Sequence, residues 1–155
     1  RDVLGSRGLG DVYKRQDQNC AYCMKGDLVA KFGYFCCEME SSNVYIFKEQ
    51  SHPGRVIVAH KKHVSEIIEL TDEERNQFFK DINTVSNAIH KVFNPDKVNY
   101  GAYGDTGHHL HFHLVPKYKD DFEWNGVFLM NPGLKIASDA ECEEIAKKLR
   151  AAMNK

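Results

Sequence analysis

The sequence predicts an α+β domain in which two amphipathic helices pack on a small antiparallel β-sheet. Short runs of β-branched and aromatic residues, VYIF at 44–47 and VIVA at 56–59, indicate strands joined by a turn that contains Pro53-Gly54. Two later segments instead repeat apolar residues every three or four positions and begin with a capping box, which is typical of helices. The chain therefore contains both strand and helix patterns of apolar residues, and it contains no internal repeat.

The two helices are predicted in the middle and at the end of the chain. The first runs from about 72 to 93, because Thr71 and Glu74 form a capping box and Asn94-Pro95 ends the apolar repeat. The second begins at the capping box Ser138–Glu141 and buries a stripe of Cys142, Ile145, Leu149 and Ala152. Between the helices, strands are predicted at 98–103 and 108–116.

Composition limits the chain to one ordinary domain that is neither disordered nor membrane-spanning. Its 155 residues are 42% hydrophobic and 28% charged, and no apolar run approaches the ~20 residues that cross a bilayer. The 21 basic and 22 acidic residues give a net charge of −1, which argues against nucleic-acid binding by bulk charge. Without a secretory signal, and with a C-x-x-C pair at 20–23, we expect a reducing, cytoplasmic setting.

Residues 1–16, RDVLGSRGLGDVYKRQ, show neither helical nor strand periodicity. They resemble a translated sequencing-adaptor string, and the alternative is a flexible native tail. We assign them no function in either case. The expected single domain covers 17–155, with a core at 20–118 and a C-terminal extension at 119–155 that carries the last helix.

Histidine is the unusual residue of this sequence, since four of its eight copies fall between 108 and 113. In HLHFHLV (109–115) strand side chains alternate, so that His109, His111 and His113 share one face while the intervening apolar side chains enter the core. Three exposed histidines without a role are the less favoured interpretation. The row suits metal binding, or attack of a neutral imidazole on phosphorus while its neighbours donate to phosphate oxygens.

The motif and its flanks resemble the histidine triad family of nucleotide hydrolases and transferases. HLHFHLV is similar to the family signature, YGAYGDTGHHLHFHLVPKY (100–118) to its long strand, and NVYIFKEQSHPGRVIVAHKKH (43–63) to its hairpin. The resemblance covers about residues 20–118 and implies a sheet of about five antiparallel strands. It also implies a nucleotide substrate, with a purine base, and a homodimer whose subunits join their sheets.

Carried over residue by residue, the resemblance implies a catalytic set of four residues. His111 matches the nucleophile that attacks the α-phosphorus, His113 matches the residue that supports the phosphate, and His109 is the first member of the triad. Asp105 lies where the family usually has a Gln or Asn donor. An ionised Asp cannot donate, so Asp105 would orient an imidazole or be protonated.

The same comparison implies the nucleotide contacts. Glu49 lies where the family often has an Asp that holds the ribose hydroxyls, and Thr106 keeps a hydroxyl donor beside Asp105. Phe47 and His113 complete the expected nucleotide-binding set. Two departures, Arg55 in place of a common His and His60 in place of a proline, bear on the substrate rather than on the reaction type.

A structural zinc ion is implied by the resemblance at Cys20, Cys23, His63 and His109. Two cysteines and two histidines would complete a tetrahedron and leave no position for water or substrate. The C-x-x-C pair alone leaves two alternatives, a redox pair or ligands supplied by Cys36-Cys37. No thioredoxin-like pattern surrounds the pair, and Cys36-Cys37 fits a buried strand.

The remaining histidines and the aromatic residues of the extension receive weaker assignments. His60 is left open as a side chain that lines the site. Phe122 and Trp124 have two interpretations, contact with the pocket of a partner subunit or anchoring of the loop on its own domain. His52 and His90 are expected to be ordinary surface residues, and His108 is expected to serve in packing or in capping a loop.

Three functions follow from these residues. The first is a nucleotide hydrolase or nucleotidyltransferase that forms a covalent nucleotidyl-histidine at His111. The second is a nucleotide-binding module with little turnover, which Asp105 motivates because the usual donor is missing. The third is a metalloenzyme in which all three strand histidines bind one catalytic metal ion.

Overall fold

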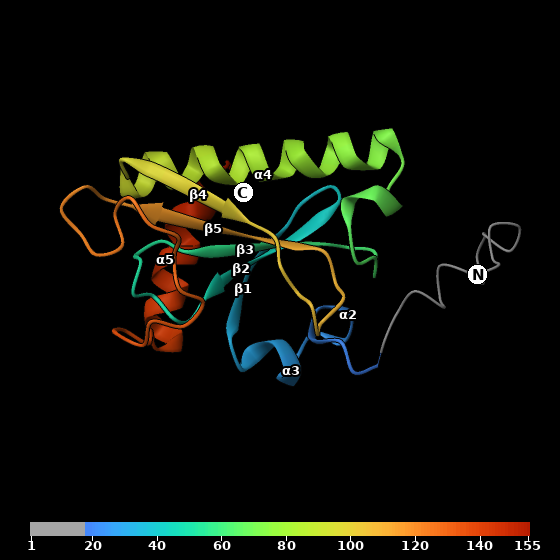
Figure 1. Ribbon diagram of the computed structural model, residues 1–155, viewed down its shortest axis with the longest axis horizontal. Coiled ribbons are helices and arrows are strands. Elements are labelled where there is room, and N and C mark those ends of the chain that lie inside the picture. The colour runs from blue at the N-terminus through green and yellow to red at the C-terminus, as the bar shows by residue number, and fades with distance from the viewer. Residues whose placement is uncertain (1–17) are drawn as a thin grey trace, which may run out of the picture.

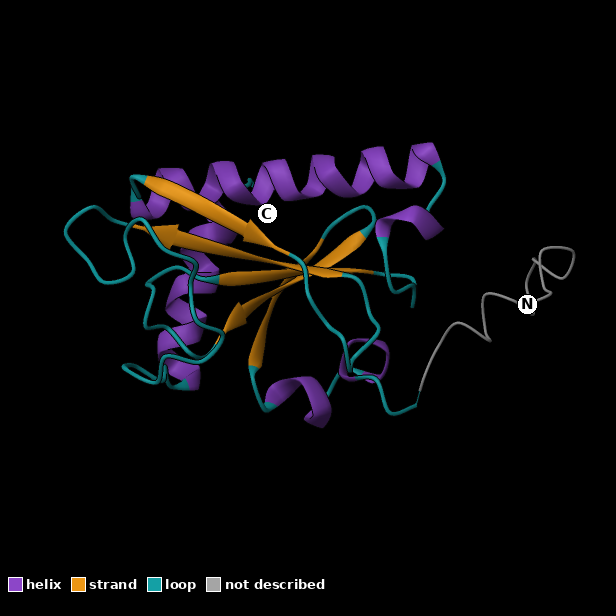
Figure 2. Cartoon of the chain, in the orientation of Figure 1, coloured by secondary structure: helices purple, strands orange, loops and turns teal. Residues whose placement is uncertain are grey.

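Five antiparallel strands form one sheet in the order β1-β2-β3-β5-β4, which confirms the predicted fold class. The computed structural model describes residues 18–155, and the leader expected at 1–16 lies outside that range. Figures 1 and 2 show the sheet with helices on both sides. The strands are β1 (Gly33–Glu38), β2 (Ser42–Phe47), β3 (Val56–His60), β4 (Lys97–Gly101) and β5 (His111–Lys117).

The two long helices begin where the capping boxes predict. In α4 (Asp72–Phe93) and α5 (Asp139–Ala152), the hydroxyls of Thr71 and Ser138 accept hydrogen bonds from the backbone N–H three residues later. Shorter elements are α2 (Ala21–Met24), α3 (Asp27–Ala30) and the 3₁₀ turn η2 (Ile67–Glu69). Within the described range, no helix is long and apolar enough to cross a membrane.

Alternation along the strands gives the sheet two apolar faces. One face packs against α4 and α5 and forms the main core, to which β2, β3 and β5 contribute Val44, Ile46, Val56, Val58 and Leu114. The opposite face holds a smaller cluster beneath α2 and α3, made of Tyr45, Phe47, Ile57 and Ala59 together with Val29. This smaller cluster borders the histidine row, since His111 pairs with Ala59 and His113 with Ile57 in neighbouring strands.

The strand that carries the histidines is shorter than predicted at its beginning. It starts at His111 rather than 108, and β4 ends at Gly101 rather than 103. Between them the chain forms a loop, in which His108 has a positive φ of 51° and its N–H donates to the Gly104 carbonyl. His109 therefore lies just outside the strand, where its ring is free to turn away from the row.

The β2–β3 turn fastens the C-terminal extension to the end of the sheet. Glu49 accepts a hydrogen bond from the backbone N–H of Gly133, and the Ser51 hydroxyl accepts one from Leu134 at 2.9 Å. Gln50 adds a backbone bond to the Lys135 carbonyl at 2.8 Å. The extension is thus held against the sheet next to the histidine row.

Candidate active site and metal-binding cluster

His111 presents a free ring nitrogen at the centre of the row. Its Nδ1 lies 2.7 Å from the backbone carbonyl of His109, which can only accept, so the ring proton is on Nδ1 and Nε2 keeps its lone pair. Burial lowers the pKa of His111 below its ordinary value, which favours the neutral imidazole. The ring of Tyr22 lies 4.9 Å from that of His111 at 34° and supports it from one side. The arrangement leaves Nε2 as a nucleophilic nitrogen.

His113 has the opposite tautomer. Its Nδ1 lies 3.1 Å from Nη2 of Arg55, a side chain that can only donate, so Nδ1 is the acceptor and the proton is on Nε2. Burial, followed by the charge of Arg55, lowers the pKa of His113 to about 3. His113 is therefore a neutral Nε2–H donor, with its ring 5.4 Å from that of His111.

His109 turns its Nδ1 away from the row and into a cluster with Cys20, Cys23 and His63. The four ligand atoms all lie within 4.8 Å of one another. His109 Nδ1 is 3.3 Å from Cys20 Sγ, 3.5 Å from Cys23 Sγ and 3.1 Å from His63 Nδ1. The structure thus brings together the four residues that the family resemblance implies as metal ligands.

The cluster fits a tetrahedral metal ion. With Zn–N of about 2.0–2.1 Å and Zn–S of about 2.3 Å, neighbouring ligand atoms of a tetrahedron lie about 3.3–3.8 Å apart, close to the separations found here. His109 Nε2 lies 2.7 Å from the His60 carbonyl and must donate to it, which leaves the Nδ1 lone pair facing the cysteines. Burial also lowers the pKa of His109 to about 4, so the ring is neutral as a ligand must be.

The alternative in which all three histidines bind one metal ion does not match the geometry. Among the described residues, the group that could hold an ion includes His109 but neither His111 nor His113. The three rings have different partners: the cluster for His109, a backbone carbonyl for His111 and a guanidinium for His113. The row therefore divides its histidines among three roles.

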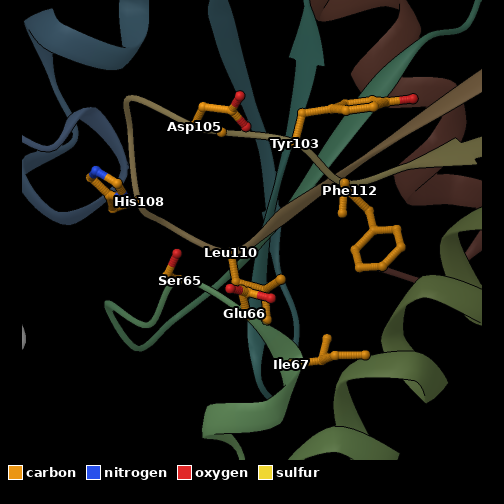
Figure 3. A pocket seen from close by; sticks show the side chains of 10 residues that line it. Ser65, Glu66, Ile67, Tyr103, Asp105, His108, Leu110 and Phe112 are labelled. Atoms are coloured by element: carbon orange, nitrogen blue, oxygen red, sulfur yellow. The ribbon is translucent and has the colours of Figure 1, made fainter.

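Asp105 and Thr106 lie on the exposed 102–108 loop. Asp105 lines a pocket of about 480 Å³ together with Glu66, His108, Leu110 and Phe112, which Figure 3 shows from close by. Leu110 and Phe112 belong to the main core on the side of the sheet that α4 and α5 cover, and Gly104 also lines this pocket. The residue of this loop that approaches His111 is Gly104, where a Cβ would lie 3.5 Å from His111 Cε1.

Glu49 and Phe47 lie near the row, but Glu49 already has partners within the chain. Its carboxylate accepts from the N–H and hydroxyl of Ser51 and from the N–H of Gly133. Burial raises the pKa of Glu49, but these hydrogen bonds outweigh burial and hold it below the ordinary value. In this conformation the carboxylate fastens the extension. Phe47 instead packs edge-on against His113, with ring centroids 5.2 Å apart.

Two histidine assignments are corrected or settled by the structure. His52 was expected at the surface, but it is 1% exposed, lies 2.6 Å from Glu123 Oε1 and stacks on Phe122 at 4.4 Å. Its burial reflects the extension, which sequence periodicity does not place. The His60 ring packs against Phe78 of α4, so His60 serves the site through its carbonyl rather than by lining it.

Comparison with known proteins identifies the fold and the histidine row together. A family model described as the HIT domain matches residues 38–120, which is more than half of the chain and includes all three histidines. The chain belongs to the histidine triad (HIT) family. The row of His109, His111 and His113 lies within the matched range and is called the triad from here on.

Relatives and solved structures agree with the family. A Dictyostelium discoideum protein named bis(5'-adenosyl)-triphosphatase is 32% identical over 78 residues, which is 47% of this chain and 52% of that protein. This chain thus spans about half the length of that relative. A histidine triad protein from Sinorhizobium meliloti has a TM-score of 0.74 at 18% identity and covers 82% of this chain and 94% of its own. A Zn-bound histidine triad family protein from Mycobacterium smegmatis has a TM-score of 0.61 at 19% identity, with coverage of 87% and 93%.

Sequence reasoning on this HIT protein did not anticipate what Arg55 touches. Arg55 was noted only as a departure from a common His, yet its side chain is fully buried and donates to His113. The sequence held one signal of this contact. Arg55 stands directly before the apolar strand VIVA (56–59), and an arginine that is buried next to such a strand needs a polar partner. The sequence also left open what the aromatic residues of the extension contact. Phe122 stacks on His52, and Trp124 lines a pocket together with Lys97 and Lys117 of the same chain.

Proposed function

We propose that this HIT protein is a nucleotide hydrolase or nucleotidyltransferase that acts at the α-phosphate through a nucleotidyl-histidine on His111. The observation that carries the proposal is the bond from His111 Nδ1–H to the His109 carbonyl, which leaves Nε2 as the free nucleophilic nitrogen. The relative named bis(5'-adenosyl)-triphosphatase supports a nucleotide substrate and a hydrolytic outcome.

The proposed reaction has two displacements at phosphorus. His111 Nε2 attacks the α-phosphorus, the P–N bond forms, and the bond from phosphorus to the leaving group breaks. The leaving group takes the electron pair of the broken bond and a proton from the site or solvent. Water, or another hydroxyl acceptor, then attacks the same phosphorus, forms the new P–O bond and releases its proton to solvent. The P–N bond breaks, its electron pair returns to Nε2, and His111 is neutral again. His113 Nε2–H donates to a phosphate oxygen throughout.

Trapping the covalent intermediate tests this function. We expect His111→Asn to fold normally and to lower kcat by at least about 10⁴-fold, because Asn offers no nucleophilic ring nitrogen. The matched control is His90→Asn on the exposed side of α4, which should leave turnover unchanged. A panel of α-³²P-labelled nucleotides should label the wild type and His90→Asn but not His111→Asn. Full activity of His111→Asn would contradict the proposal.

The metal cluster is proposed to hold one structural zinc ion. Zinc bound by Cys20, Cys23, His63 and His109 would tie the α2 segment to the triad and hold the ring plane of His109. Support comes from the ligand separations, from the tautomer of His109, and from the solved relative described as Zn-bound. The ion takes no part in the proposed reaction.

The homodimer is also a proposal, and apolar residues of the extension support it. Val127, Leu129, Leu134 and Ile136 are each more than 60% exposed in the single chain, more apolar surface than one loop normally leaves to water. We expect light scattering to give a dimer mass for the wild type and a monomer mass for Val127→Glu. Lys119→Glu, at an exposed position, is the control and should remain a dimer. A monomeric wild type would contradict the proposal.

A further inference from the structure

Arg55 is a buried cation beside the triad. It follows the Pro53-Gly54 turn at the start of β3, and its side chain is fully buried. The guanidinium carbon lies 4.3 Å from the ring centre of Phe47 and 5.0 Å from that of Phe128, so that two aromatic faces enclose the charge. Among the described residues, no carboxylate forms an ion pair with it. The aromatic faces and neutral acceptors contact the charge directly, and the carboxylates of Glu49 and Glu123 favour it electrostatically from beyond ion-pair distance.

The hydrogen bonds of Arg55 lead to the extension and to His113. Nη1 donates to the Leu129 carbonyl at 3.2 Å, and Nη2 donates to Met130 Sδ at 3.3 Å and to His113 Nδ1 at 3.1 Å. Although burial lowers the pKa of Arg55 to about 10, the group remains charged at neutral pH. Arginine has five N–H donors and no acceptor. A neutral histidine next to it must accept, whichever way the ring turns.

The three triad histidines differ in what sets their tautomers. His109 is held by a backbone carbonyl on Nε2 and His111 by a backbone carbonyl on Nδ1, so the main chain sets both tautomers. Among the described residues, the His113 ring forms no hydrogen bond to the main chain. Its Nδ1 accepts a hydrogen bond from the Arg55 side chain instead. The state of the third histidine therefore depends on the identity of residue 55.

We propose that Arg55 is a positioning residue that fixes His113 in the Nε2–H tautomer, so that His113 presents a donor rather than a lone pair to the phosphate. The value of the constraint rests on the proposed nucleotidyl transfer at His111. With His113 held as a donor, His111 is the one triad histidine whose free nitrogen faces substrate. Arg55 thus separates nucleophile from donor between two otherwise identical side chains.

The tautomer can be read directly in the full-length, metal-loaded protein. In a sample with ¹⁵N-labelled histidine, two-bond ¹H–¹⁵N spectra distinguish a protonated ring nitrogen from an unprotonated one, and the signals missing in His113→Asn assign His113. We expect wild-type His113 to show protonated Nε2 and unprotonated Nδ1 at pH 7. A protonated Nδ1 in the wild type would overturn the proposal without any variant of Arg55.

Variants of Arg55 test the cause. Arg55→Lys keeps a charged group that can only donate and should preserve the His113 tautomer, with kcat within about tenfold of wild type. Arg55→Met keeps bulk without a donor and should shift both ring nitrogens of His113 toward a mixture of tautomers. It should also lower kcat by about 10- to 100-fold with little change in KM. Arg150→Met, far from the triad on α5, is the matched control and should leave the His113 signals unchanged.

The outcomes separate this inference from the proposed function. If Arg55→Met folds and keeps wild-type His113 signals, Arg55 is only structural and the inference is wrong. If Arg55→Met does not fold, folded Arg55→Lys decides the question. A changed His113 tautomer in Arg55→Lys overturns the inference, and an unchanged one supports it. If the wild type hydrolyses no nucleotide, the proposed function fails while the spectra still decide the role of Arg55.

Discussion

At the scale of single residues, the site depends on which partner each histidine nitrogen finds. His109, His111 and His113 are identical in the sequence, and their spacing predicts a shared face but no division of roles. The tautomers of His109 and His111 follow from two backbone acceptors, the carbonyls of His60 and His109. The tautomer of His113 follows from a side-chain donor, Arg55, which is distant in the sequence. A single sequence does not reveal these contacts, because each requires the folded path of the backbone.

Asp105 and Gly104, two neighbours in one loop, likewise show a contact that the sequence alone does not reveal. The sequence draws attention to the side chain of Asp105, whereas the structure brings the backbone of Gly104 to His111. Gly104 has a φ of +110°, a conformation that residues with a Cβ rarely adopt. A methyl group at this position would be strained and would also contact the nucleophile.

Gly104→Ala is therefore expected to reduce both stability and activity. The unfavourable φ should cost about 1–3 kcal/mol in the free energy of unfolding. A loop that shifts to relieve this φ changes its packing against His111, which should lower kcat severalfold. Gly107→Ala in the same loop is the matched control, because nothing lies within 4 Å of its added Cβ. Urea unfolding and steady-state kinetics measure both effects. Equal behaviour of the two variants would show that the loop does not position His111.

At the scale of elements, local signals predict the helices and leave the connections undetermined. The capping boxes at Thr71 and Ser138 place the starts of α4 and α5 correctly, because the hydroxyl and the N–H it bonds are three residues apart. The start of β5 depends instead on its pairing with β3, in which the outermost pair is Ala59 with His111. The extension depends on polar residues of the β2–β3 turn, whose partners lie about 80 residues later in the chain.

The α2 segment gives the prediction that belongs to this scale. Because α2 is a single turn, we expect zinc to hold it, and Cys20→Ser with Cys23→Ser should lose the one equivalent of zinc and lower the Tm. Cys142→Ser, on the buried face of α5, is the control and should lower the Tm but keep the zinc. Metal analysis by mass spectrometry after gel filtration measures this. Zinc that is retained by the double variant and lost in His111→Asn would favour a metal ion bound by the triad instead.

At the scale of the whole molecule, three carboxylates hold the C-terminal part of the chain in place. Glu49 and Glu143 tie it to the rest of the chain, and Glu141 acts within it. Glu49 holds the extension, Glu141 closes the capping box of α5 and pairs with Lys135, and Glu143 accepts from Tyr34 of β1 and pairs with Arg150. The pKa of each is held below its ordinary value, that of Glu141 to about 2 by the Ser138 backbone N–H and Lys135. These ties are made by the ionised forms.

Acid should therefore weaken the attachment of α5 and the extension first. A lowered pKa means that the folded state holds fewer protons than the unfolded state, so the stabilisation is complete above about pH 4.5 and is lost as the pH falls toward 2. Glu141→Gln should be less stable than wild type at pH 6, and the difference should shrink between pH 4.5 and 2. Glu144→Gln, an exposed neighbour on the same helix, should follow the wild type throughout. Urea unfolding at a series of pH values measures this, and a gap between Glu141→Gln and wild type that stays constant down to pH 2 would show that the ionised carboxylate does not hold the helix.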